Sequence, residues 1–320
     1  MSDFQDRTIQ ELYRLKRRGA QWHAVQAANE VGIFGELDSG QKTAAQLADS
    51  LSLNEDAVGR LMRVLLQTEM VEQYGNDFAL TSLGSLIPVS MRNFAGPSWE
   101  QLANHLKTGE SIDDPTWDAE FHSREWTMTP AAINAMKCLD IGKTRKGLRI
   151  LDIGCGSGVF GAAIAHRDPT TRLTFLDTAN QLKRAKETIE SVGIEAKVLW
   201  AECDPASELQ MFEAEEPFDL IFVVNRIHRM NVMEQEAMYI KLHSLLKPEG
   251  ELALIDVFAG QENGQNDVAI FGLESGLRTG GNDCDAPRIE YSLKASSFRQ
   301  VQFAWLPCEP HLYGLMLATR

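Results

Sequence analysis

The sequence lacks the features that would place it in a membrane, in a disulfide scaffold or on a nucleic acid. No apolar run approaches the roughly 18 residues that a membrane-spanning helix needs. The five cysteines lie far apart and include no CxxC pair, which argues against a disulfide framework and a zinc site and indicates reduced thiols in a cytoplasmic protein. Lys and Arg total 31 against 45 Asp and Glu, a net charge of −14. Such a chain is short of the cations that bind phosphate, so we expect no nucleic-acid or membrane partner.

The composition is otherwise that of a globular protein. Hydrophobic residues make up 44% and charged residues 24% of the chain, which is enough apolar surface for a core. A length of 320 residues predicts about two domains. The first six residues are polar and acidic and do not have the pattern of a secretory signal. Changes of pattern along the chain divide it into residues 1–92, 93–146 and 147–320.

Residues 1–92 have the pattern of a winged helix. Apolar residues at helical spacing, with Thr43 and Asn54 as N-caps, predict two short helices, and two β-prone runs predict a hairpin over 71–80. Between Thr43 and Thr81 there are two basic and six acidic residues. Because a DNA-reading helix needs a cationic face, we interpret this region as a packing or dimerisation module.

Residues 93–146 read as helical and are rich in aromatic side chains. Planar ligands favour aromatic linings, so this segment is either a wall of an acceptor pocket or simple core packing. The aromatic residues concerned are Trp99, Trp117, Phe121 and Trp126.

From Leu148 onward strands and helices alternate, which predicts a doubly wound, Rossmann-like parallel sheet. The last two strand-like runs, 298–305 and 312–319, leave no room for a crossover helix between them, so we expect them to pair antiparallel at one edge. The predicted fold class is therefore α/β: a mostly parallel sheet with an antiparallel edge, preceded by an α-rich winged-helix domain.

The strongest local signal is a glycine loop after the first strand of this sheet. Gly154, Gly156 and Gly158 alternate and open a helix, where free backbone N–H groups can meet a ligand. The run from Gly156 fits the dinucleotide pattern G-x-G-x-x-G, with Asp177 lying 21 residues further on, which is typical of a nicotinamide or flavin site. Asp152 at the strand tip, however, repels a pyrophosphate and suits a cationic ligand, which favours S-adenosylmethionine.

Three more residues complete the predicted cofactor site. Asp177 ends the second strand and can accept hydrogen bonds from both ribose hydroxyls. Cys203 and Asp204 follow the third strand and can meet the adenine amino group. A glycine loop that holds no ligand is the remaining alternative.

Several motifs, taken in order, resemble a known family. They are Gly32-Ile33-Phe34, the run Thr43 to Ala48, the run Arg60 to Leu65, Ala79-Leu80-Thr81, the glycine loop with Asp177 and Asp204, and the segment around His228. In this order they resemble the two-domain, S-adenosylmethionine-dependent small-molecule O-methyltransferases of plants and bacteria, over nearly the whole chain. The resemblance implies a small-molecule acceptor and a homodimer, with the winged helix at the interface and the partner subunit helping to close the acceptor pocket.

The resemblance also implies roles for particular residues. His228 stands where the family has the base that removes the acceptor's hydroxyl proton, and Asn225 precedes it beside the cofactor. Asp256 and Asp283 match the two carboxylates that flank this base, although family members usually have Glu at both places. An acid and Trp usually follow the family's His, whereas this chain has Arg229 and Met230.

The chemistry of a histidine base is sound on its own terms, because imidazole titrates near neutral pH and can accept a proton there. No spacing of His, Cys and Asp matches a metal site, so we expect no metal. We therefore predict methyl transfer from S-adenosylmethionine to a small, aromatic or conjugated acceptor, at a hydroxyl. The alternatives are methylation of carbon or nitrogen, and a regulatory protein that binds the cofactor without transferring the methyl group.

Overall fold

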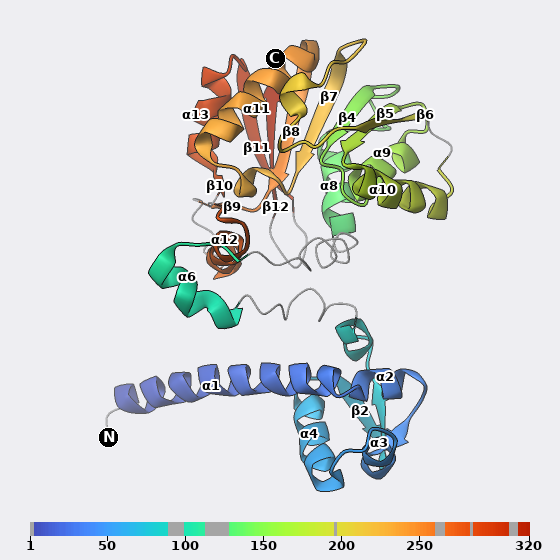
Figure 1. Cartoon of the computed structure of the whole chain (residues 1–320), viewed down its shortest axis with the longest axis vertical. Coiled ribbons are helices and arrows are strands. Elements are labelled where there is room, and N and C mark those ends of the chain that lie inside the picture. Colours follow the sequence, from blue (N-terminus) through green and yellow to red (C-terminus); the bar gives the residue numbers. More distant parts are fainter. Residues whose placement is uncertain are drawn as a thin grey trace. The chain divides into compact units, whose positions relative to one another are not determined.

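The computed structural model describes residues 3–88, 99–112, 128–194, 197–259, 266–281, 284–306 and 313–320. The chain divides into two compact units, Met1–Gly96 and Pro97–Arg320 (Figure 1). The three-part division inferred from sequence stays a prediction. Trp117, Phe121 and Trp126 of the aromatic segment lie outside the described residues.

The N-terminal unit combines helices with a small sheet. Its described strands pair antiparallel in the order β1-β3-β2. The two short helices and the hairpin predicted between Thr43 and Thr81 are present as α3, α4 and β2–β3. In chain order the elements are α1 (Asp3–Glu30), α2 (Ile33–Asp38), β1 (Lys42–Thr43), α3 (Ala44–Ser50), α4 (Glu55–Gln67), β2 (Val71–Tyr74), β3 (Asp77–Leu80) and η1 (Gly84–Leu86).

The helix starts of this unit are capped as the sequence predicts. The Thr43 hydroxyl accepts the Gln46 N–H at 3.2 Å while the Gln46 side chain accepts the Thr43 N–H at 2.8 Å, which is a capping box at the start of α3. The Asn54 side chain accepts the Ala57 N–H at 2.9 Å and starts α4. The capped helices bury a common apolar core, which includes Val25, Phe34, Leu47, Val58, Met62, Leu65 and Phe78.

Seven described strands of the C-terminal unit form one sheet in the order β11-β12-β8-β7-β4-β5-β6, and β9 and β10 pair parallel in a separate two-stranded sheet. The central strands are parallel, and β12 pairs antiparallel with both β8 and β11. The predicted fold class, including the antiparallel edge, is confirmed. The strands are β4 (Arg149–Ile153), β5 (Arg172–Asp177), β6 (Lys197–Glu202), β7 (Phe218–Val224), β8 (Leu246–Asp256), β11 (Gln300–Leu306) and β12 (Tyr313–Thr319).

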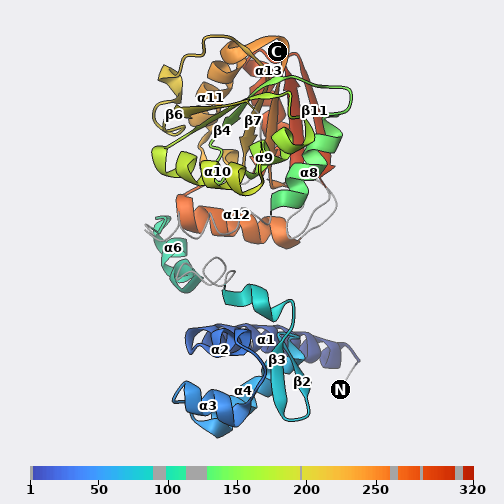
Figure 2. The same cartoon turned by 90° about the vertical axis from the view of Figure 1, so that its right-hand side faces the viewer.

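Helices cover both faces of this sheet (Figure 2). Successive strand residues point to opposite faces, so Ile150 joins the core under α8, α9 and α10, whereas Leu151 joins the core under α11 and α13. No helix among the described residues is long and apolar enough to cross a membrane. The remaining elements are η2 (Trp99–Gln101), α6 (Leu102–Thr108), α8 (Thr129–Cys138), α9 (Val159–Arg167), α10 (Ala179–Ser191), η4 (Leu209–Met211), η5 (Ile227–Arg229), α11 (Val232–Leu245), β9 (Phe258–Ala259), α12 (Asn266–Thr279), β10 (Cys284–Asp285) and α13 (Ala286–Ala295).

The strand order creates a crevice at the carboxyl end of the sheet. From β4 the chain moves outward through β5 and β6, then returns to the other side of β4 as β7. Ligands of open α/β sheets bind at the carboxyl ends of the strands, beside the point where the strand order reverses. Asp152, Asp177 and Asp256 all lie at these carboxyl ends, so the topology brings together residues that are far apart in the sequence.

Candidate active site

The loop after β4 has a backbone shape that glycine adopts with little strain. Gly154, Gly156 and Gly158 have φ angles of 65°, 54° and 75°, in the left-handed region that L side chains disfavour. An added Cβ at Gly158, the N-cap of α9, would lie 2.9 Å from the Ala185 Cβ on α10. The small residues therefore let α9 begin close to α10. The N-terminus of α9 lies at the carboxyl end of the sheet.

Asp152 lines a small cleft beside this loop. The side chain is 1% exposed, and the cleft is also lined by Gly154, Cys155, Ser157 and Asn225. A helix N-terminus favours a negative group, and a carboxylate favours a positive one. The cleft therefore suits a zwitterionic ligand end, such as that of an amino acid.

Asp177 ties the glycine loop to β5. Its Oδ2 accepts the Gly156 N–H at 2.9 Å, and its Oδ1 accepts the Thr178 N–H at 2.8 Å. The side chain is 6% exposed. An ionised carboxylate has about four acceptor positions, so Asp177 can still accept hydrogen bonds from a sugar's hydroxyl groups.

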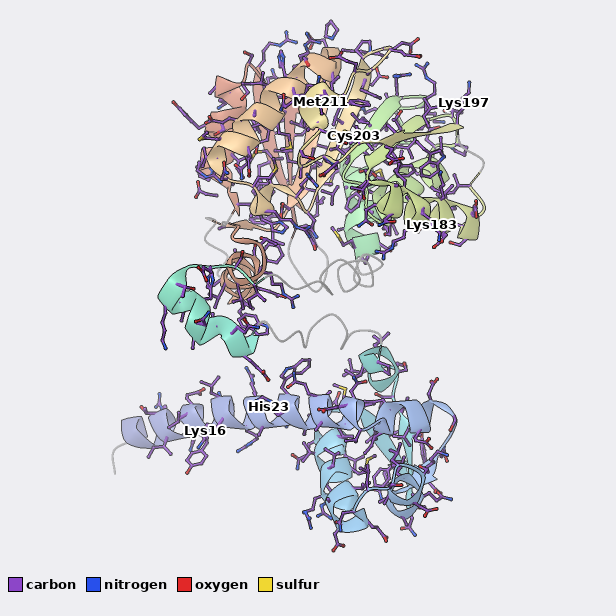
Figure 3. The ribbon with its side chains drawn as sticks, viewed as in Figure 1. Lys16, His23, Lys183, Lys197, Cys203 and Met211 are labelled. Carbon is purple, nitrogen blue, oxygen red and sulfur yellow. The ribbon has the colours of Figure 1, made fainter. Side chains whose placement is uncertain are left out.

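Cys203 and Asp204 lie directly after β6, next to Asp177. The Cys203 N–H donates to the Asp177 carbonyl at 3.0 Å, and Figure 3 labels Cys203 in the C-terminal unit. Burial raises the pKa of the Cys203 thiol. Hydrogen bonds from the Ala206 N–H, at 2.9 Å, and the Ser207 hydroxyl, at 2.7 Å, lower the pKa of Asp204 and keep it ionised.

His228 and Asp256 form a buried pair at the end of β7 and β8. His228 is 5% exposed and Asp256 is fully buried, and the Nδ1 of His228 lies 2.9 Å from Oδ1 and 3.1 Å from Oδ2 of Asp256. The Val257 N–H donates to the same carboxylate at 2.8 Å. Because a carboxylate only accepts hydrogen bonds, this network assigns the proton to Nδ1 and leaves a lone pair on Nε2.

The His228 ring has two neighbours besides Asp256, and one of them contacts the lone pair on Nε2. The Nε–H of Arg229 donates to the Nε2 of His228 at 3.4 Å. The ring of Phe271, on α12, packs edge-on with ring centroids 4.9 Å apart. The imidazole is thus held by a carboxylate on one side, while a guanidinium lies beside the nitrogen that can accept a proton.

Asn225 directly follows β7 and lines the cleft. Its φ is 52°, and its amide donates to the Met128 sulfur at 3.3 Å and to the Tyr313 hydroxyl at 3.5 Å. A non-glycine residue in this left-handed conformation costs about 1 kcal/mol or more, and such strain is concentrated at functional sites.

The sequence also predicted a second carboxylate, Asp283, and no metal ion. Asp283 lies outside the described residues, so its position relative to His228 is still a prediction. Within the described ranges, no group of His, Cys, Asp and Glu side chains is arranged to hold a metal ion. Sequence reasoning missed Arg226, whose side chain packs against Gly154. Its position two residues after β7 was the only signal available.

Comparison with known proteins identifies the type of domain that contains these residues. Residues 150–250 match the family model of a methyltransferase domain. The chain contains a methyltransferase domain. The matched residues run from β4 into β8, so this methyltransferase domain includes the glycine loop, Asp177, Cys203 and His228.

Whole-chain similarities extend beyond the methyltransferase domain. The mitomycin biosynthesis 6-O-methyltransferase of Streptomyces lavendulae is 23% identical over 263 residues, which is 73% of each chain. The structure of a mitomycin 7-O-methyltransferase is 18% identical, with a TM-score of 0.80 and 99% of each chain covered. Human N-acetylserotonin methyltransferase in complex with S-adenosylmethionine is 16% identical, with a TM-score of 0.77, covering 100% of this chain and 99% of the human protein.

These findings confirm the resemblance to two-domain S-adenosylmethionine-dependent O-methyltransferases. The methyltransferase-domain match and the mitomycin relative confirm the predicted enzyme class, an S-adenosylmethionine-dependent methyltransferase, and its cofactor, rather than a nicotinamide or flavin enzyme. The structural likenesses, at these identities, concern the fold alone.

Proposed function

We propose that this methyltransferase transfers a methyl group to the hydroxyl of a small, aromatic or conjugated acceptor, with His228 as the base. The observation that carries the proposal is the buried His228–Asp256 pair, with Nδ1 2.9 Å from the carboxylate. A His held in this way has the correct tautomer and orientation to take a proton at Nε2. The names of the mitomycin and N-acetylserotonin methyltransferases also support a small-molecule acceptor.

The residues at the carboxyl ends of the strands fit the cofactor. Asp152 and the α9 N-terminus suit the ammonium and carboxylate of the methionine end, and Asp177 suits the ribose. We assign the loop glycines Gly154, Gly156 and Gly158, together with Cys203, Asp204 and Asn225, to the same site. When bound, S-adenosylmethionine supplies an electrophilic methyl group on a sulfonium.

The chain's own residues then handle the proton. His228 removes it from the acceptor hydroxyl at Nε2, and Asp256 stabilises the imidazolium that forms. An acceptor oxygen bound to Nε2 lies beside the Arg229 guanidinium, 3.4 Å from that nitrogen, which stabilises the negative oxygen. This arrangement favours acidic hydroxyls, such as phenols and enols, over simple alcohols. Asp283 is proposed, on the family resemblance, as the second carboxylate near the base.

The test is methyl transfer from labelled S-adenosylmethionine to a panel of phenols and hydroxyquinones. We expect His228→Ala to lower the rate by about 100- to 10,000-fold, the range of general-base contributions, while S-adenosylhomocysteine still binds. The matched control is His243→Ala, because His243 packs against Phe298 elsewhere in the unit and its loss leaves the rate nearly unchanged. A His228→Ala enzyme as fast as wild type would contradict the proposal.

One observation favours a second candidate, a regulatory protein that binds the cofactor without methyl transfer. The Arg229 Nε–H donates a hydrogen bond to the lone pair on Nε2 of His228. The family usually has an acid at the position of Arg229. In that case no acceptor is methylated by the wild-type chain, and S-adenosylmethionine binding changes only the affinity for a partner. Methylation at carbon or nitrogen is distinguished by the position of the label in the product.

We also propose that the chain is a homodimer formed through a winged-helix N-terminal unit, in the cytoplasm. The N-terminal half of α1 extends beyond the rest of its unit (Figure 1), and Ile9, Leu12 and Tyr13 on it are 46%, 57% and 61% exposed. Apolar side chains gathered on an exposed helix face are typical of association surfaces. The net charge of −14 supports the absence of a nucleic-acid partner.

A further inference from the structure

Arg226 lies in the crevice at the carboxyl end of the sheet. An ideal Cβ built on Gly154 would be 3.2 Å from Nη1 and 3.4 Å from Cδ of Arg226. The side chain therefore crosses from the end of β7 onto the glycine loop after β4. Gly154 leaves the space that this crossing needs.

Three groups of the proposed adenosine site interact electrostatically with the charge of Arg226. Burial lowers the pKa of its guanidinium, and the charges of Asp177 and Asp204, together with the nearby Cys203 thiol, act in the opposite direction. In return, the Arg226 charge contributes to the lowered pKa of Asp204. Its guanidinium thus belongs electrostatically to the same subsite as the two carboxylates.

One donor of this guanidinium has no acceptor. The Nε of Arg226 is buried and has no hydrogen-bond partner within the described part of the chain. Leaving a buried donor unsatisfied is unfavourable, so a ligand that accepts a hydrogen bond from this Nε–H recovers that cost.

We propose that Arg226 forms one side of the adenosine subsite, where its Nε–H donates a hydrogen bond to a ring nitrogen of the adenine base. The cofactor's base, flat and lined with acceptor nitrogens, is the part that matches this residue. The inference rests on the proposed placement of the nucleoside by Asp177 and Asp204. It assigns Arg226 to binding and leaves the proton transfer to His228.

The test is calorimetric titration of the full chain with S-adenosylmethionine, S-adenosylhomocysteine and 5′-methylthioadenosine, which lacks the amino-acid end. We expect Arg226→Ala to weaken all three by about tenfold, the size of one hydrogen-bond contribution. Arg226→Lys keeps the charge but has no Nε–H donor at that position, so it should restore little of the affinity. The control is Arg172→Gln, at the opposite end of β5 from Asp177, which should leave all three affinities unchanged.

Other outcomes overturn the inference. A loss confined to the two ligands with an amino-acid end would mean that Arg226 binds the cofactor's carboxylate. A change confined to the ratio of S-adenosylmethionine to S-adenosylhomocysteine affinities would mean that it acts only through its charge. Asp177→Asn tests the underlying placement separately: if it leaves every affinity unchanged, the proposed nucleoside site is wrong whatever Arg226 does. Thermal unfolding of each variant establishes that the protein is folded.

Discussion

At the scale of single residues, hydrogen bonds to Asp256 hold the His228 ring in one orientation and one tautomer. The Asp256 carboxylate is fully buried and receives hydrogen bonds from Nδ1 of His228 and from the Val257 N–H. The His228 backbone N–H donates to the same carboxylate at 3.4 Å, and together these hydrogen bonds fix the imidazole ring and its tautomer. This arrangement requires no movement of the base before proton transfer, which is the usual advantage of a preorganised site.

Asp256→Asn tests this fixation with an isosteric side chain. An amide can turn its NH₂ toward Nδ1, which reverses the tautomer and places the proton on Nε2. We expect the methyl-transfer rate to fall by about 100-fold or more, with S-adenosylhomocysteine affinity within twofold of wild type. A variant that loses affinity and rate in parallel would instead assign Asp256 a structural role.

At the scale of elements, the glycine loop joins β4, α9 and β5 into one rigid corner. The Gly154 N–H bonds the Leu176 carbonyl, and the Gly156 N–H bonds Asp177. At the far end of α9 a second corner is tied by Asp168, which accepts hydrogen bonds from the Gly147 N–H at 2.7 Å and from Thr170 and Thr171. Asp177 thus holds a loop at the carboxyl end of the parallel strands, and Asp168 holds a loop at their amino end.

Gly158→Ala is expected to destabilise the fold. Alanine at this position would keep a positive φ, and its Cβ would lie 2.9 Å from the Ala185 Cβ. Backbone strain and overpacking together would lower the free energy of unfolding by about 2–4 kcal/mol. Gly193→Ala is the matched control, because Gly193 has a φ of 64° but nothing within 4 Å of an added Cβ. Urea unfolding of both variants measures the difference, and equal losses would rule out the steric contact.

Asp168→Asn tests the second corner through pH. Burial opposes ionisation, but hydrogen bonds from Thr170, Gly147 and Thr171 outweigh it and leave the pKa of Asp168 below its usual 3.8. A lowered folded pKa contributes stability that is present above the unfolded pKa and lost as the pH falls through the folded one. We expect the variant to be less stable by about 1–3 kcal/mol at pH 7. Urea unfolding should show this gap closing below pH 3.8; a gap independent of pH would contradict the assignment.

At the scale of the whole molecule, two units with separate cores share one chain. The described residues at the carboxyl end of the C-terminal sheet include the proposed cofactor residues and the proposed base. The N-terminal unit contributes an exposed apolar face on α1. The proton transfer proposed for His228 does not involve that face, and sedimentation measures association without an activity assay.

Leu12→Glu with Tyr13→Glu is expected to produce a monomer by sedimentation, if the exposed face of α1 forms the dimer. Burying two charges in an apolar interface without partners is strongly unfavourable. Arg18→Glu is the control, because helical spacing from Ile9 puts residue 18 on the opposite face of α1, and it should leave the assembly unchanged. A wild-type chain that sediments as a monomer would overturn the dimer proposal.

The sequence alone determined the order of the elements, the caps at Thr43 and Asn54, the parallel sheet with its antiparallel edge, and the glycine loop. Each follows from residues close together in the chain, because capping, periodicity and turn preference act over a few residues. The family resemblance put Asp256 beside His228, 28 residues away, but the tertiary structure alone decided that Nδ1 is the atom that meets it, that Arg229 lies on Nε2, and that Arg226 crosses the glycine loop. These contacts depend on which strands become neighbours and where long side chains find room, and both are set by packing of the whole sheet.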